Sequence, residues 1–185
     1  RTPLAAVKTQ AQVALGATSD GERGRALANV VNGTDRASRL VEQLLVLARL
    51  DPQTALPSGQ AVDLRALAQQ GVAEIAPAAA GKGVEVGLAP GDAAPVAGDA
   101  VLLAVLLRNL LDNAVRYTPP GGEVEVSVRR TDSGVSLAVV DTGPGIPEAE
   151  RGKAFDRFHR ILGSGEEGSG LGLSIVRRIA DLHRA

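Results

Sequence analysis

The sequence predicts an α+β protein in two parts, a helical hairpin followed by an α/β sandwich with helices on one face of a mixed sheet. Two observations carry this prediction. Apolar residues recur every three or four positions through the first fifty residues, as in helices that pack along a seam. Further along, short stretches of alternating apolar residues are interleaved with longer helical patterns, a mixture that favours helices layered on a sheet.

The first part is predicted to be an antiparallel hairpin, with helical spacing over residues 4–14 and again over residues 27–48. Ser19 and Glu22 fit a capping box that opens the second helix, and Pro52 disfavours helix at the residue before it. A lone hairpin cannot bury so wide an apolar face, so we expect two copies to form a four-helix bundle. Packing of the hairpin on its own second domain is the alternative.

Proline and glycine in the next stretch indicate a linker. We therefore expect a hairpin domain at residues 1–51, a linker at 52–61 and a second domain at 62–185. In the second domain, strands are predicted at 62–64, 84–88, from 96, at 124–128 and at 135–140, the last being the more buried. Helices are predicted from Asp63 towards Pro77 and Gly81, from Asp99 over 100–117, and from 171 to about 183.

Composition narrows the classes of function. The net charge of −1 argues against general nucleic-acid binding, which usually needs a basic excess. The absence of cysteine excludes disulfides and thiolate-metal sites. The longest strongly apolar run, residues 100–107, is far shorter than the roughly 20 residues that cross a bilayer. The sequence thus reads as a soluble globular protein or as the soluble part of a larger one.

Polar residues at the end of the 100–117 helix form the first candidate site. Asn109, Asn113, Arg116 and Tyr117 share one helical face. Two carboxamide oxygens one turn apart suit a hard cation that also takes phosphate oxygens, which is typical of magnesium. The arginine could neutralise phosphate charge, and the tyrosine offers an aromatic face to a base. The alternative is a core helix that ends in polar residues.

Two glycine-containing segments complete the candidate site. Asp141 directly follows a strand, where its carboxylate could accept from the exocyclic amine of adenine, and Gly143 and Gly145 allow a sharp turn close to a flat ring. Gly168 and Gly172 belong to a segment that opens the final helix, where amide donors and the helix dipole favour phosphate. Ordinary turns are the alternative for each segment alone. Together the three segments predict binding of magnesium-ATP.

The order of these segments resembles the N, G1 and G2 boxes of the histidine-kinase ATP-binding domain. Phe155 to Arg160 resembles the F box of that family, and Arg1 to Leu4 resembles the end of its H box. Five ordered motifs over almost the whole chain make the resemblance specific. It implies the dimeric histidine-kinase hairpin followed by an ATP-binding domain of the Bergerat or GHKL fold, from a bacterial two-component sensor kinase.

The resemblance also implies roles for individual residues. Asn109 and Asn113 would hold Mg²⁺, and Thr2 and Asn109 are the candidate catalytic residues, Thr2 by assisting dephosphorylation of a response regulator. The remaining residues implied at the ATP site are Arg116 near the phosphates, Tyr117, Asp141, Gly143 and Gly145 around the base, Phe155, Phe158 and Arg160 at the lid, and Gly168, Gly170, Leu171 and Gly172 at the triphosphate.

The resemblance implies a function and partners as well. The γ-phosphoryl group of ATP would pass to an H-box histidine and then to an aspartate of a response regulator, with regulator phosphatase activity beside it. The protein would be a homodimer that binds a receiver domain and no nucleic acid. It would be the cytoplasmic part of a protein anchored in the bacterial inner membrane through segments outside this chain.

Departures from the family pattern leave alternatives open. The acceptor histidine is expected three residues before Arg1, and the closing strands of the family are expected after Ala185, so both ends appear cropped. His159 and His183 are interpreted as structural or solvated. Hydrolytic relatives place a glutamate where this chain has Asn109, which cannot act as a general base, so transfer is favoured over hydrolysis. A GHKL ATPase, a non-enzymatic ATP-binding scaffold and a protein that acts chiefly as a phosphatase are the alternatives.

Overall fold

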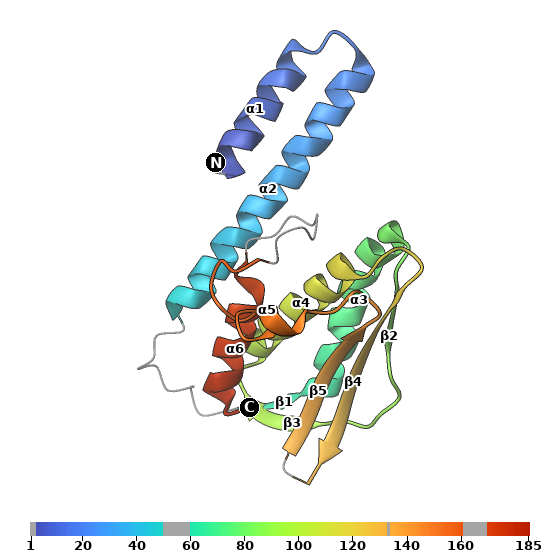
Figure 1. Cartoon of the computed structure of the whole chain (residues 1–185), viewed down its shortest axis with the longest axis vertical. Coiled ribbons are helices and arrows are strands. Elements are labelled where there is room, and N and C mark those ends of the chain that lie inside the picture. Colours follow the sequence, from blue (N-terminus) through green and yellow to red (C-terminus); the bar gives the residue numbers. More distant parts are fainter. Residues whose placement is uncertain (1–2, 50–59, 133, 161–169) are drawn as a thin grey trace. The chain divides into compact units, whose positions relative to one another are not determined.

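The computed structural model describes residues 3–49, 60–132, 134–160 and 170–185. The chain divides into two compact units, Arg1–Arg49 and Leu50–Ala185 (Figure 1). Among the described helices, none combines the length and the apolar character needed to cross a lipid bilayer.

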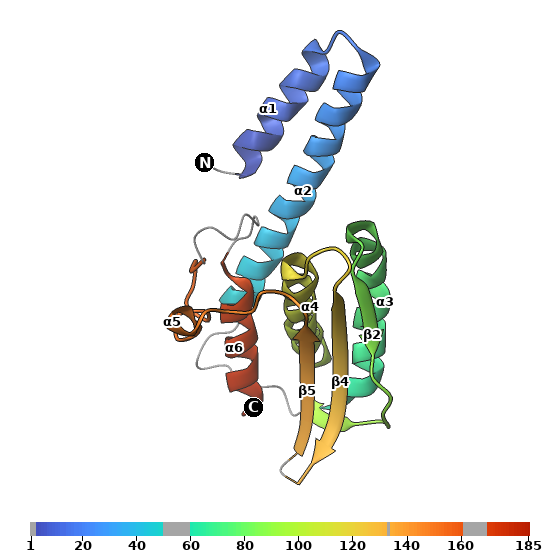
Figure 2. The ribbon, with the colours of Figure 1, turned by 45° about the vertical axis from the view of Figure 1, so that its right-hand side comes forward.

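The first unit is an antiparallel helical hairpin of α1 (Pro3–Gly16) and α2 (Asp20–Arg49), as Figures 1 and 2 show. The Glu22 amide donates to Ser19 Oγ at 3.2 Å, so the predicted N-cap of the second helix is confirmed. The helices approach closely at Gly33, where a β-carbon would lie 2.6 Å from Val7 Cγ2. The predicted end of the second helix at Asp51 falls outside the described residues.

The second unit contains helices on one face of a mixed sheet, as predicted (Figure 2). Its elements are β1 (Gln60–Asp63), α3 (Leu64–Lys82), β2 (Glu85–Leu88), β3 (Pro95–Gly98), α4 (Ala100–Tyr117), β4 (Glu123–Thr131), β5 (Gly134–Asp141), α5 (Glu148–Arg151) and α6 (Gly172–His183). Strand β4 pairs in parallel with β2 and antiparallel with β5, while β1 and β3 form a separate antiparallel pair. Residues 60 and 61, expected in the linker, therefore begin β1.

Two aspartates cap the long helices of this unit, as the sequence predicts. Asp99 Oδ1 accepts from the amides of Val101 and Leu102 at the start of α4. Asp63 Oδ1 accepts from the amide of Ala94 at 3.0 Å and from that of Arg65, at the start of α3, at 2.9 Å. The hydrogen bond from Ala94 holds the pKa of Asp63 below its usual value, although burial opposes the shift.

The core lies between the sheet and α3 and α4. Its largest fully buried side chains are Leu107 and Leu111 of α4 and Val124 and Val126 of β4. The prediction that residues 135–140 form the more buried strand is wrong, since β5 is half-buried and Val140 is 61% exposed. The reason is topological, because β4 is central in the described sheet and β5 has a neighbour on one side only.

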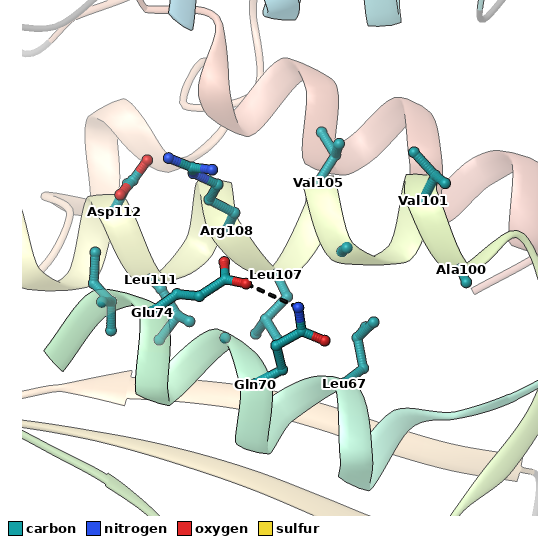
Figure 3. A pocket seen from close by; sticks show the side chains of 13 residues that line it. Leu67, Gln70, Glu74, Ala100, Val101, Val105, Leu107, Arg108, Leu111 and Asp112 are labelled. Atoms are coloured by element: carbon teal, nitrogen blue, oxygen red, sulfur yellow. Dashed lines mark hydrogen bonds between the residues drawn. The ribbon is translucent and has the colours of Figure 1, made fainter. Parts of the chain in front are cut away.

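A groove of about 450 Å³ runs between α3 and α4. Its floor includes Leu107 and Leu111, and the two helices approach closely there because Gly71 has no side chain: a β-carbon at Gly71 would lie 2.9 Å from Leu107 Cδ2. Figure 3 shows Arg108 and Asp112 along one side of this groove. Leu107 and Leu111 mark the face of α4 that packs against α3.

Candidate functional site

The two asparagines of the predicted magnesium site lie together, on the side of α4 that meets the start of α6. A β-carbon on Gly172 would lie 3.1 Å from Asn109 Oδ1 and 3.5 Å from Asn113 Nδ2. Asn109 is buried, and its side-chain amide donates to the carbonyl of Val105 at 2.8 Å. The Asn109 Oδ1 atom lies on the side of Gly172. The first and third sequence segments thus meet in the fold.

The segment that begins at Asp141 contacts the carboxyl end of α4, near the asparagines. A β-carbon on Gly143 would lie 2.9 Å from the Tyr117 carbonyl oxygen and 2.7 Å from Asp141 Oδ1. The amide of Gly143 donates to Asp141 Oδ1 at 2.9 Å, which fixes the carboxylate at the end of β5. Gly143 is therefore required for a close approach of two backbones. Gly145 follows with a φ of 69°, a conformation that glycine adopts without strain.

Thr142 is a residue of this turn that sequence reasoning missed. Its hydroxyl accepts from the Glu123 amide at 2.9 Å, and its own amide donates to the Glu123 carbonyl at 3.1 Å. These bonds join the turn after β5 to the start of β4. The signal was present, since a threonine next to an aspartate that ends a strand can bond a neighbouring backbone.

The F-box residues lie at the surface of this unit. Phe155 is 40% exposed and Phe158 is 69% exposed, so neither side chain is buried in the core. Phe158 has a φ of 63°, which is strained for an aromatic residue, and its amide donates to the carbonyl of Gly170 at 2.8 Å. A β-carbon on Gly170 would lie 2.7 Å from the Phe158 carbonyl carbon. The segments at 158 and 170 are therefore bound to each other.

The remaining predicted site residues are placed as follows. Arg116 is half-buried in the last turn of α4, and Arg160 is exposed. Leu171 is 2% exposed, and its carbonyl accepts from Ser174 Oγ and the Ile175 amide at the start of α6. Its side chain therefore serves the core. Thr2 and Gly168 fall outside the described residues, so their predicted roles stay predictions.

Both histidines make structural contacts. His159 Nε2 lies 2.8 Å from Glu150 Oε2 of α5, a short helix that the sequence did not predict. His183 Nε2 accepts from the Asp99 amide at 3.1 Å, and its Nδ1 lies 2.8 Å from the Ile179 carbonyl oxygen. This geometry agrees with the interpretation of both as structural residues.

Chemically, the arrangement offers two amide groups, one carboxylate and a glycine at a helix start along one side of α4. The described residues contain no cluster of three or more histidine, cysteine or acidic side chains that could hold a metal by themselves. Two neutral amides are an incomplete ligand set for Mg²⁺, which prefers several oxygens and takes the rest from water and phosphate. The residues therefore fit a cation that arrives with a polyphosphate.

Comparison with known families agrees with this geometry. Residues 98–185 match the family model described as histidine kinase-, DNA gyrase B- and HSP90-like ATPase. Residues 1–53 match the model of the His Kinase A phospho-acceptor domain. Fold and site thus define a histidine-kinase core, an ATPase-type domain preceded by a phosphoacceptor-type hairpin.

Individual relatives narrow the class. Sensor protein kinase PmrB of Pseudomonas aeruginosa is 42% identical over 99% of this chain and 38% of its own length. The solved cytoplasmic segment of histidine kinase QseC is 37% identical, with a TM-score of 0.52 over 80% of each chain. Full-length ShkA in complex with AMPPNP is 27% identical, with a TM-score of 0.70 over 98% of this chain and 41% of that one.

The chain belongs to the family of two-component sensor histidine kinases. It spans between 38 and 40% of the length of the first curated relatives that it matches.

Proposed function

We propose that this chain is the kinase core of a sensor histidine kinase, with magnesium-ATP bound between α4, the turn after β5 and the start of α6. The observation that carries the proposal is the convergence of three segments distant in the sequence. Asn109 and Asn113 meet Gly172, while Tyr117 and Asp141 meet at Gly143. The presence of AMPPNP in the related ShkA structure supports a nucleotide at this site.

In this proposal each side chain has one task. Asp141 accepts from the exocyclic amine of adenine, and Tyr117 packs against the base. Asn109 and Asn113 hold Mg²⁺ through their amide oxygens, and Arg116 faces phosphate charge. When bound, Mg²⁺ would neutralise the charge that develops on the transferring phosphoryl group. Backbone amides at the start of α6, near Gly170 and Gly172, donate to phosphate oxygens.

The proposed reaction is phosphoryl transfer to a histidine. The bond between the γ-phosphorus and the bridging oxygen breaks to leave ADP, a phosphorus–nitrogen bond forms, and the imidazole loses a proton. Hydrolysis is disfavoured because Asn109 cannot act as a general base. Asp112, a nearby carboxylate of the same helix, lines the groove towards α3 instead. The acceptor would be a histidine outside these 185 residues, since His159 and His183 lie in the second unit.

The hairpin supports the proposal of a homodimer. Several of its apolar side chains lie at the surface of this unit, the most exposed being Leu15 at 87% and Val31 at 58%. Burying such residues against a second hairpin would give a four-helix bundle. From the same family membership we propose a response-regulator receiver domain as the partner of phosphotransfer, Thr2 as an aid to its dephosphorylation, and a cytoplasmic location beside the inner membrane.

Binding of magnesium-ATP is tested by Asn113→Ala in isothermal titration calorimetry. We expect wild type to bind magnesium-ATP and the variant to lose at least about tenfold in affinity, which is about 1.4 kcal/mol. Asn29→Ala is the matched control, because Asn29 lies in α2 and donates to Gln10 of the hairpin. Equal affinity of wild type and Asn113→Ala would show that the metal assignment is wrong.

Kinase activity is tested on a protein to which three residues of the family's H box, His-Glu-Leu, are added before Arg1. Labelled ATP should then phosphorylate the added histidine in an acid-labile form, while the 185-residue chain should take no label at Thr2, His159 or His183. ATP binding without label on the extended protein would favour the non-enzymatic scaffold. Release of phosphate without a labelled protein would favour an ATPase.

A further inference from the structure

The carboxyl end of α4 is held by a side chain from another helix. An α-helix leaves its last carbonyl groups without partners inside the helix. In α4, the Ala114 carbonyl accepts from the amide and the hydroxyl of Thr118, at 3.0 and 2.7 Å. The next two carbonyls, those of Val115 and Arg116, accept from the ammonium group of Lys82, which lies 3.1 Å from the Val115 oxygen.

Lys82 itself is fixed in position. It lies in the last turn of α3 and is half-buried, and Gly83 ends that helix in the left-handed conformation with a φ of 74°. The Gly83 carbonyl accepts from the Gly121 amide at 2.7 Å, which ties the end of α3 to the segment after α4. A cation at this position also interacts favourably with the negative end of the α4 dipole.

The carboxyl end of α4, which Lys82 holds, also lies at the part of the proposed nucleotide site that would bind the adenine base. Tyr117 follows the two carbonyls directly, and its own carbonyl lies against Gly143. Gly143 in turn donates to Asp141, the proposed adenine acceptor. A shift of the last turn of α4 would therefore displace Tyr117 and push on the turn that sets the Asp141 carboxylate.

We propose that Lys82 is a positioning residue for nucleotide binding, which acts through the carbonyl groups of Val115 and Arg116 and not by contact with ATP. The inference rests on the proposed function, because it assumes that Tyr117 and Asp141 bind the base. Lys82 sets the position of the last turn of α4, and that turn sets the width of the base pocket. Removal of the Lys82 donor groups lets the end of α4 unwind and weakens the binding of every adenine nucleotide by the same factor.

The test compares Lys82→Met with Lys82→Arg and with Arg65→Met. Met keeps most of the aliphatic stem and removes the donor, while Arg restores a cationic donor. Arg65 is the matched control, because it is a cation of the same helix that donates to a backbone carbonyl, that of Ala89, far along the chain from the site residues. Affinities for magnesium-ATP and magnesium-ADP are measured by calorimetry, and stability is measured by urea unfolding.

We expect Lys82→Met to lower the affinities for ATP and ADP by the same factor, about five- to tenfold, which corresponds to the net contribution of about one hydrogen bond. Lys82→Arg should recover most of this loss. Arg65→Met should lower stability and leave both affinities at the wild-type values. If Lys82→Met does not fold, Lys82→Gln, which keeps a donor without charge, should show an intermediate loss of affinity.

The outcomes separate this inference from the proposed function. The role of Lys82 would be overturned if Lys82→Met, or Lys82→Gln where that variant is needed, bound both nucleotides with wild-type affinity. Loss of binding in Asp141→Asn in the same experiment would show that the proposed ATP site is still correct. Equal losses of affinity in Lys82→Met and Arg65→Met would also overturn it, because they would indicate general destabilisation. Failure of wild type to bind either nucleotide would overturn the proposed function itself.

Discussion

Gly172 and Asn109 are in such close contact that a β-carbon on the glycine would lie 3.1 Å from the asparagine Oδ1. The first residue of α6 thereby limits the space beside the buried amide of α4. A contact of this kind is tighter than ordinary van der Waals packing, so even one methyl group at position 172 would displace the amide. This contact places Asn109, a proposed metal ligand, beside Gly172 at the start of α6, where phosphate is proposed to bind.

Gly172→Ala should therefore lower the affinity for magnesium-ATP by about tenfold, or about 1.4 kcal/mol, because the added methyl group moves Asn109 from its position. Calorimetric titration with magnesium-ATP measures the effect. Gly152→Ala is the control, since Gly152 has a helical φ of −63° and a β-carbon there would meet nothing within 4 Å. Unchanged affinity in Gly172→Ala would show that the amide of Asn109 does not need its present position.

Asp63 predicts an acid-dependent loss of stability. Its pKa is lowered in the folded protein, chiefly by the hydrogen bond from the Ala94 amide. A carboxylate of this kind stabilises the fold above its unfolded pKa of about 3.9, and the contribution is lost as pH falls through the lower folded value. Urea unfolding should show Asp63→Asn to be less stable than wild type near neutral pH.

The difference between Asp63→Asn and wild type should shrink as pH falls below about 4 and be smallest below the lowered folded pKa of Asp63, where the carboxyl group is neutral in both states. Asp20→Asn is the control, since the ion pair of Asp20 with Arg23 is fully exposed on the carboxylate side. A difference for Asp63→Asn that stays constant from neutral to acid pH would contradict the assignment.

His183 is expected to stabilise the second unit by linking α6 to the start of α4. His183→Ala removes the acceptor of the partly buried Asp99 amide and should lower the free energy of unfolding by about 1–2 kcal/mol. His159→Ala is the matched comparison and should cost less than about 1 kcal/mol, because it breaks a side-chain pair with Glu150 that is 24 and 34% exposed and leaves no backbone amide without its acceptor. Chemical denaturation of the two variants checks the order, and equal losses would refute it.

Like charges on the outer face of the sheet predict a stabilising substitution. Glu85 of β2 and Glu123 of β4 are exposed and directly in register. Glu123→Lys should raise the free energy of unfolding by about 0.5–1 kcal/mol, because it replaces repulsion by attraction. Glu123→Gln should give about half of the gain, and the gain of the lysine variant should shrink in high salt. A lysine variant less stable than wild type would contradict the prediction.

Local signals in the sequence were sufficient for most of the fold. Asp99 before a strongly apolar run predicts α4 with the bounds Ala100–Tyr117 that the structure has, because an N-cap and a proline after the end are both local features. The relative burial of β4 and β5 was not predictable in this way. Both carry alternating apolar residues, and their burial depends on which strand is central in the sheet, a long-range property.

The residue types of the candidate site were predictable, and their contacts were not. Asn109, Asp141 and Gly172 stand out because an amide, a carboxylate and a glycine recur in an order typical of one family. Lys82 does not stand out, since a lysine near the end of a helix is common on solvated surfaces. Its contact with Val115 depends on how α3 and α4 pack, which no local pattern encodes.

The two ends of α4 are gripped by side chains of different helices, His183 of α6 through the Asp99 amide and Lys82 of α3 through two carbonyls. A helix that is hydrogen-bonded to neighbouring helices at both ends has little freedom to move relative to them. Under the proposed function, α4 would therefore keep its position while the nucleotide binds and leaves.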